Sequence, residues 1–233
     1  MKNLDKIVNK IEKSIDDKDK IREQALRITR EIIIGCRKAI QSIHQNLMKD
    51  AKNGIKKASA KLQELYEITK NHPELYHAGF VENAAQELVE ASCLYNIING
   101  EDLPDPDDLQ TTYSSYLLGL CDLVGELRRS ALDSIRNNKS KEADDFLSMM
   151  QNIYDVIIRF DYPSALIPIR KKQDMIRNLI EKTRGEIAIA TCERRIEYHT
   201  DEFRGMLDKV NENKKKTKDK KEEEKDLDID KIW

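Results

Sequence analysis

Apolar residues recur every three or four positions along most of this chain, and glycine and proline interrupt the pattern only rarely. The 233 residues include 8 Gly and 5 Pro, too few for the frequent turns that an all-β protein needs. Apolar spacing of three to four residues is typical of helices that bury one face. The sequence therefore predicts an all-helical protein, in one large domain or at most two.

Turn signals divide this pattern into six or seven helices. Pro73 ends one helical segment, because proline lacks a backbone donor and disfavours the helical conformation in the preceding residue. The pair Asn99-Gly100 ends the next segment, and Asp107 or Asp108 would cap the one that follows. The expected helices span roughly 3–16, 18–50, 55–69, 74–98, from that cap to 136, 140–159, and from after Pro168 to about 212.

The apolar spacing ends near residue 213. The following segment, KKKTKDKKEEEKDLDID, carries alternating blocks of charge, which is typical of a solvated tail, either disordered or a frayed helix. We therefore expect a helical domain over residues 1–212 and a charged tail over residues 213–233.

Charge, cysteines and hydropathy limit the partners and the compartment. The net charge of −2 provides no global basic field for nucleic acid, although an enclosed surface can be basic while the outside balances it. Four cysteines without a CxxC pair predict neither a zinc site nor a disulfide framework, which fits a reducing cytosol. No apolar run approaches the roughly 18 residues of a membrane span. We expect a cytoplasmic oligomer with no membrane partner.

Four carboxylates interrupt helix faces that are otherwise apolar. At about 100° per residue, Glu87 and Glu90 lie about 60° apart on one apolar stripe. In the segment YLLGLCDLVGEL the only charges are Asp122 and Glu126, which are four residues apart and share a helix face. Gly119 shares that face too, which would let a ligand or another backbone come close.

Buried acids of this kind have two physical explanations. Burying an ionised carboxylate costs several kcal/mol unless it is paired or binds a metal. Two helices that each present two acids could converge on a hard cation such as Mg²⁺, Mn²⁺ or Ca²⁺. The acids could equally form buried salt bridges with Arg37, Lys38, Arg128 or Arg129. The patterning alone favours neither explanation, and a di-iron bundle would need Glu-x-x-His motifs that these helices lack.

These segments resemble a known family. Residues 116–129, YLLGLCDLVGELRR, are similar to the YLLGxxDLxGELxR signature of translin-associated factor X, the catalytic partner of translin. QELVEA at 86–91 is similar to that family's EYVEA segment, which carries its two metal-binding glutamates. The family's SRDIT-x-x-SKR-x-I-x-x-x-H is echoed by Thr29, Arg30, Glu31, Cys36, Arg37, Lys38, Ile40 and His44. The similarity covers most of residues 20–200.

The resemblance implies a seven-helix α-superhelical subunit, assembly into a hollow octamer, and binding of single-stranded RNA or DNA inside it. Glu87 and Glu90 match the glutamates of EYVEA, and Asp122 and Glu126 match the acids of DLxGE. Because all four acids are present, the chain resembles the catalytic branch, whose members are Mg²⁺-dependent endoribonucleases. The alternatives are a translin-like homo-octamer that binds nucleic acid without cutting it, and a helical scaffold with salt-bridged acids.

The four acids differ in the roles that we expect. Asp122 and Glu126 are the strongest candidates for direct ligands of Mg²⁺ or Mn²⁺, and Glu90 follows, whereas Glu87 could act through a water molecule. Basic side chains that would grip phosphates, unless they are surface charges or partners of the acids, are Arg30, Arg37, Lys38 and Arg129, together with His44.

Overall fold

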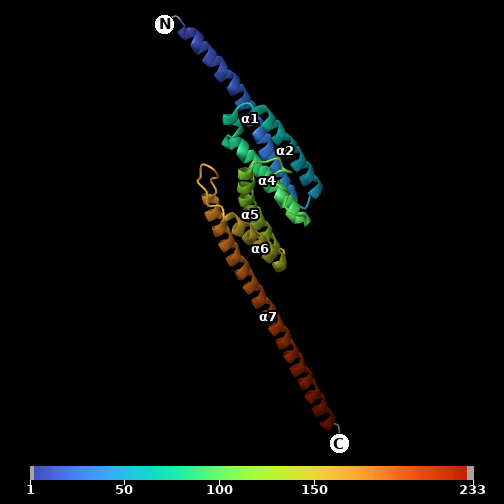
Figure 1. The fold of residues 1–233 in the computed structure, drawn as a ribbon. Coiled ribbons are helices and arrows are strands. Elements are labelled where there is room, and N and C mark those ends of the chain that lie inside the picture. The colour runs from blue at the N-terminus through green and yellow to red at the C-terminus, as the bar shows by residue number, and fades with distance from the viewer. Residues whose placement is uncertain (1–2, 230–233) are drawn as a thin grey trace. The chain divides into compact units, whose positions relative to one another are not determined.

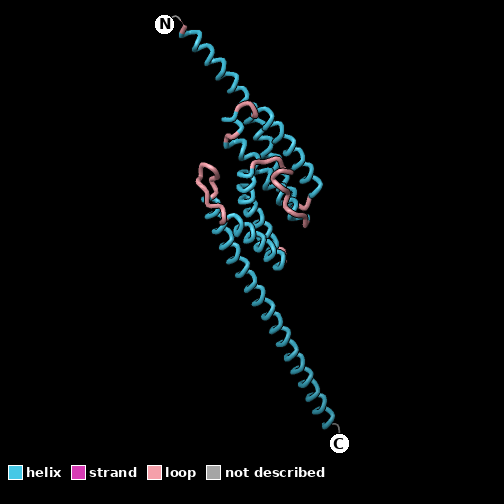
Figure 2. The backbone as a smooth tube through the Cα atoms, viewed as in Figure 1, coloured by secondary structure: helices cyan, strands magenta, loops and turns pink. Residues whose placement is uncertain are grey.

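The computed structural model describes residues 3–229, with side chains described as far as residue 214. Over these residues it contains seven α-helices and no strand (Figure 1, Figure 2). The helices are α1 Leu4–His44, α2 Met48–Thr69, α3 Pro73–Tyr76, α4 Gly79–Asn99, α5 Tyr113–Arg136, α6 Ser140–Ile157 and α7 Arg170–Ile229. The prediction of an all-helical, seven-helix subunit is confirmed.

The chain divides into two compact units, Met1–Arg184 and Gly185–Trp233. The first unit contains α1 to α6 and the first turns of α7, and the second contains the rest of α7. The backbone of α7 is helical as far as Ile229, through most of the segment expected to be a charged tail. The expected domain boundary at residue 212 stays a prediction. None of the described helices is long and apolar enough to cross a membrane.

The first helix is longer than the sequence suggested. We expected separate helices over residues 3–16 and 18–50, with Asp16-Asp17 as the cap of the second, but α1 runs without interruption to His44. An aspartate caps a helix only where the backbone leaves the helical conformation, and here Asp17 remains helical and pairs with Lys20 one turn later. The second expected helix, 18–50, is also wrong in its end, because the chain turns between His44 and Met48.

Helices α1 and α2 lie side by side in the first unit (Figure 1). Gly54, which falls in the expected gap between the helices 18–50 and 55–69, lies inside α2 and permits this approach. A Cβ atom on Gly54 would be 3.2 Å from Cβ of Ala39. The interface therefore depends on small side chains, and glycine serves packing here rather than helix termination.

Helix α4 is the central helix of the first unit, because it packs against α1, α2 and α5. Its buried side chains accordingly surround it on most sides, so its apolar residues are not confined to one narrow face. Gly100 ends α4 with φ of 71°, a left-handed conformation that glycine adopts without strain. The predicted stop at Asn99-Gly100 is confirmed.

The start of α5 differs from the prediction. The cap is Thr112, whose Oγ1 accepts a hydrogen bond from the Ser115 backbone N–H at 3.1 Å. Asp107 and Asp108 lie in the preceding turn, where the Asp107 backbone N–H donates to Asp105 Oδ1 at 2.8 Å. The aspartates of this segment therefore belong to a local turn. As a result, α5 begins about one helical turn later in the sequence than predicted.

Candidate functional site

Gly119 sets the distance between the two helices that carry the acids. A Cβ atom on Gly119 would lie 2.7 Å from Cβ of Val89 and 2.9 Å from the carbonyl oxygen of Gln86, closer than such atoms come in proteins. Only glycine therefore lets α5 approach the backbone of α4 at this point. Gly125, by contrast, has open space beside it. The expected role of Gly119 in close approach is seen, and its partner is another helix.

This close approach groups Glu87, Glu90, Asp122 and Glu126 in what we call the acidic cluster. The effect of this grouping is clearest in the pKa of Glu90. The pKa of its carboxyl is raised to about 8, mainly by burial and further by the negative charges of Asp122, Glu126 and Glu87, against a smaller opposing effect of Lys172. The side chains of the other three acids are between one fifth and one third exposed, so the cluster remains open to solvent.

Helix α1 supplies two of the basic side chains that the sequence singled out. Arg37 Nη2 donates to Glu87 Oε1 at 2.9 Å, and His44 Nε2 lies 2.5 Å from Glu126 Oε2. The hydrogen bond with His44 lowers the pKa of the Glu126 carboxyl, and the nearby Arg129 guanidinium, 3.6 Å away, lowers it further. Glu126 is therefore held ionised, whereas Glu90 favours its protonated form.

Lys172, in the first turn of α7, is the residue of the site that sequence reasoning missed. Its Nζ lies 2.5 and 2.6 Å from the two carboxylate oxygens of Asp122. It also donates to the carbonyl oxygen of Leu118 at 3.3 Å and to Gln86 Oε1 at 3.5 Å. The sequence did contain a signal, because Lys172 lies one turn before the buried Ile176 and in phase with it.

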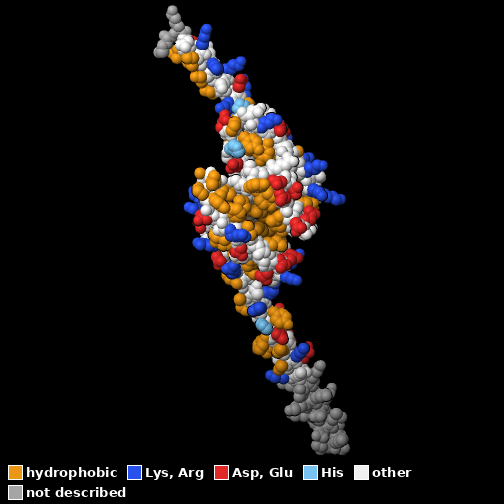
Figure 3. Space-filling model, in the orientation of Figure 1, with side chains coloured by type: hydrophobic (Ala, Val, Ile, Leu, Met, Phe, Trp, Pro, Cys, Tyr) orange, Lys and Arg blue, Asp and Glu red, His pale blue; other side chains and the backbone are white. Residues whose placement is uncertain are grey.

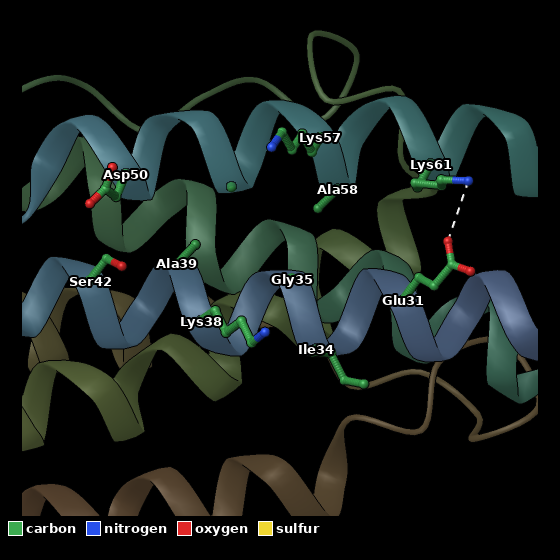
Figure 4. A pocket seen from close by; sticks show the side chains of 11 residues that line it. Glu31, Ile34, Gly35, Lys38, Ala39, Ser42, Asp50, Lys57, Ala58 and Lys61 are labelled. Carbon is green, nitrogen blue, oxygen red and sulfur yellow. Dashed lines mark ion pairs between the residues drawn. The ribbon is translucent and has the colours of Figure 1, made fainter.

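Lys38, one of the predicted RNA-binding residues, lies away from the acidic cluster. Lys38 lines a groove of about 560 Å³ between α1 and α2, together with Lys57 and Lys61. Figure 4 shows these side chains along the groove, with Lys61 paired to Glu31. None of the four acids lines this groove. Arg30 is exposed on α1.

Three of the four acids are turned toward basic side chains: Glu87 to Arg37, Glu126 to His44, and Asp122 to Lys172. In these positions, no three Asp, Glu, His or Cys side chains of the described residues are grouped closely enough to hold a metal ion. The donor set itself, four carboxylates, is the kind that binds Mg²⁺ or Mn²⁺. The cluster thus combines a ligand set for a hard cation with basic residues that would have to give way to it.

Comparisons with known proteins cover the same part of the chain. The model of the Translin family matches residues 20–184. An uncharacterized protein of Methanocaldococcus jannaschii is 34% identical over 173 residues, which are 73% of this chain and 77% of that protein.

Solved structures of C3PO proteins have the same fold. AfC3PO in a complex with duplex RNA and AfC3PO alone each give a TM-score of 0.73 and 33% identity, covering 80% of this chain. The match covers 97% and 98% of those chains, respectively. Apo-NeC3PO gives a TM-score of 0.71 at 18% identity over 78% of this chain and 96% of that one, a likeness of fold alone.

Proposed function

We propose that this chain, which belongs to the Translin family, is an endoribonuclease. It would bind RNA and hydrolyse it with Mg²⁺ at the acidic cluster. The likeness to AfC3PO, which has been solved with duplex RNA, supports RNA as the ligand. The sequence resemblance favours single-stranded RNA, with single-stranded DNA as a further ligand. Mn²⁺ would also support the reaction in place of Mg²⁺, since both ions accept carboxylate oxygen ligands.

The observation that carries this proposal is the burial of the Glu90 carboxyl among other acids. The other three acids each have a basic partner, but the described residues give Glu90 none, and its pKa of about 8 reflects burial among like charges. Burying an acid among other acids destabilises a fold unless a cation balances them. A divalent cation in contact with Glu90, Asp122 and Glu126 would remove this cost. A protein that only binds phosphates gains nothing from such a cluster.

The residues of the site would divide the work as follows. Asp122, Glu126 and Glu90 would hold the cation, and Glu87 would act through a water molecule. Mg²⁺ bound there would lower the pKa of a coordinated water and offset charge on the scissile phosphate. His44 keeps the Glu126 carboxylate ionised.

The basic residues near the cluster would position the RNA backbone. Arg37 and Arg129 are more than half exposed beside the acids, so their guanidinium groups can reach phosphate oxygens from solvent. Lys172, once displaced from Asp122 by the cation, would add a third positive charge. Lys38 would contact RNA away from the cluster, in the groove between α1 and α2, and Arg30, which is exposed on α1, would add a further contact.

We also propose that the protein acts as a cytoplasmic homo-oligomer, an octamer by the family resemblance. Its exposed apolar side chains support assembly, since the first unit alone leaves Ile34, Tyr113 and Leu166 more than half exposed. Native mass spectrometry of the full chain tests this point directly. A monomer at micromolar concentration would overturn it.

Cleavage of labelled RNA, single-stranded and duplex, in Mg²⁺ or in EDTA tests the function. We expect Mg²⁺-dependent cleavage of the single-stranded substrate, which Glu90→Gln and Asp122→Asn abolish while binding in EDTA persists. Glu101→Gln, which changes an exposed glutamate outside the cluster, is the matched control and should cut normally. Cleavage that persists in EDTA would refute the metal mechanism. Binding without cleavage would leave a translin-like binding protein, and no binding at low salt would leave a scaffold.

A further inference from the structure

The second unit carries a narrow stripe of exposed apolar side chains. Ile189, Ile196, Phe203 and Val210 are 61%, 66%, 63% and 49% exposed and follow one another at intervals of seven residues. Figure 3 shows hydrophobic side chains exposed on this part of α7. A helix with regularly spaced exposed apolar residues and no partner is marginal in water, because helical stability comes mostly from packing such a face.

The spacing is that of a coiled coil. If the four residues above occupy the first position of a heptad, the fourth position falls on Cys192, His199 and Met206. Cys192 is exposed as well, and Met206 is 56% exposed. Both core positions of the heptad are thus available for a partner helix.

This stripe lies outside the part of the chain that the family shares. The family match ends at residue 184, and the AfC3PO structures cover 80% of this chain although nearly all of their own residues are matched. The apolar face of the second unit is therefore not explained by the fold held in common.

The charges beside the stripe identify its occupant. Arg195 and Glu202 occupy the same flanking heptad position, seven residues apart. When two copies pair in antiparallel orientation with Ile196 facing His199, Arg195 of each copy lies opposite Glu202 of the other. A parallel pairing would instead place Arg195 opposite Thr200 and His199 opposite itself. We propose that residues 185–214 pair with the same segment of a second copy as an antiparallel coiled coil.

The length of the stripe supports a second copy of the same segment. From Ile189 to Val210 the stripe spans about 32 Å at 1.5 Å per residue. The other exposed apolar stripe of the described chain, Leu4 to Ile15 on α1, spans only about 17 Å. The shorter stripe would leave half of the longer one uncovered, whereas in the register above two copies of the longer one cover each other from Ile189 to Met206, and only Val210 falls outside, opposite Gly185.

Cross-linking of the full chain distinguishes the orientations. The antiparallel register places Cys192 of one copy against position 203 of the other. In Phe203→Cys, mild oxidation should therefore join the introduced thiol to Cys192 between copies, as mapped by peptide mass spectrometry. A link between two Cys192 residues in the unaltered protein would show a parallel pair and overturn the proposal. Absence of any intermolecular link would overturn it too. So would a photo-cross-linker at Ile196 that reacts with residues 4–15 instead of with residues 185–214.

Charge exchange gives a second, independent test. Glu202→Arg places two arginine pairs in the antiparallel interface, so we expect about tenfold weaker association by sedimentation. Adding Arg195→Glu should restore the association, because opposite charges then face each other again. Glu197→Arg makes the same charge change on the outward face and should have no effect. If the double variant stays as weak as Glu202→Arg, the register is wrong.

Discussion

Replacing Glu90 with glutamine should change how the stability of this protein depends on pH. Glutamine has nearly the shape of a protonated glutamate but cannot ionise. The Glu90 carboxyl has a pKa of about 8 in the folded protein, against 4.5 for the unperturbed group. The folded state therefore holds the proton more tightly than the unfolded state, and the glutamine variant removes that difference.

The sign and the size of the effect follow from linkage between protonation and folding. Since the folded pKa is the higher one, stability from this group is fully present below pH 4.5 and falls as the pH rises from 4.5 to 8. A tenfold change in proton affinity is worth about 1.4 kcal/mol, so the complete loss is about 5 kcal/mol at most. Rearrangement of Lys172 and entry of water would reduce this figure.

Urea unfolding in EDTA, at a fixed protein concentration and at pH 5, 7 and 9, measures the effect. At pH 5 the wild type and Glu90→Gln should be about equally stable. At pH 9 the variant should be more stable by a few kcal/mol, a shift of about 1–2 M in the urea midpoint. Addition of Mg²⁺ at pH 9 should stabilise the wild type more than the variant.

Glu101→Gln is the control, because it removes an exposed carboxyl outside the cluster. Its stability should differ from that of the wild type by the same small amount at all three pH values. A free-energy difference between wild type and Glu90→Gln that does not change between pH 5 and pH 9 would refute the argument that Glu90 is destabilised by burial and by its acidic neighbours.

Two further substitutions test the parts that hold the cluster together. Gly119→Ala should lower the free energy of unfolding by about 1–3 kcal/mol, because its Cβ would overlap Val89 and the backbone of α4, whereas Gly125→Ala, with open space beside it, should be neutral or slightly stabilising in the same urea titration. Lys172→Met should weaken stability at pH 8 in EDTA, because it leaves Asp122 unpaired and removes the charge that lowers the pKa of Glu90. Mn²⁺ should then raise the melting temperature of Lys172→Met more than that of the exposed control Lys171→Met. An equal rise in both variants would contradict the proposal that Lys172 competes with the cation for Asp122.

Much of the secondary structure was predictable because it depends on local patterns. The break between the helix that ends at residue 136 and the one that begins at 140, and the stop at Gly100, were anticipated correctly. The errors occurred where a residue has two uses. Asp17 is both a capping residue and a solvent-exposed partner for Lys20, and Gly54 is both a helix breaker and a small packing residue. Only the neighbouring helix decides between such uses.

The acids of the candidate site could also be found in the sequence. Glu87, Glu90, Asp122 and Glu126 each stand on a helix face that is otherwise apolar, and that mismatch is local information. The same reasoning left salt bridges and a metal equally open. The structure shows basic partners for three of the acids. Arg37 was among the partners that the sequence suggested, whereas His44 and Lys172 were not.

What the sequence determined by itself is therefore the helical class, the positions of most turns and the four misplaced acids, because each follows from spacing within one helix. Tertiary structure alone decided that Gly119 lets α5 approach α4, that His44 reaches Glu126 from 82 positions away, and that Lys172 reaches Asp122 from 50. A helical period tells which face a residue occupies, but not which other face it meets. That choice is made by packing among distant segments, and it set the partners and the pKa of the acids at the candidate site.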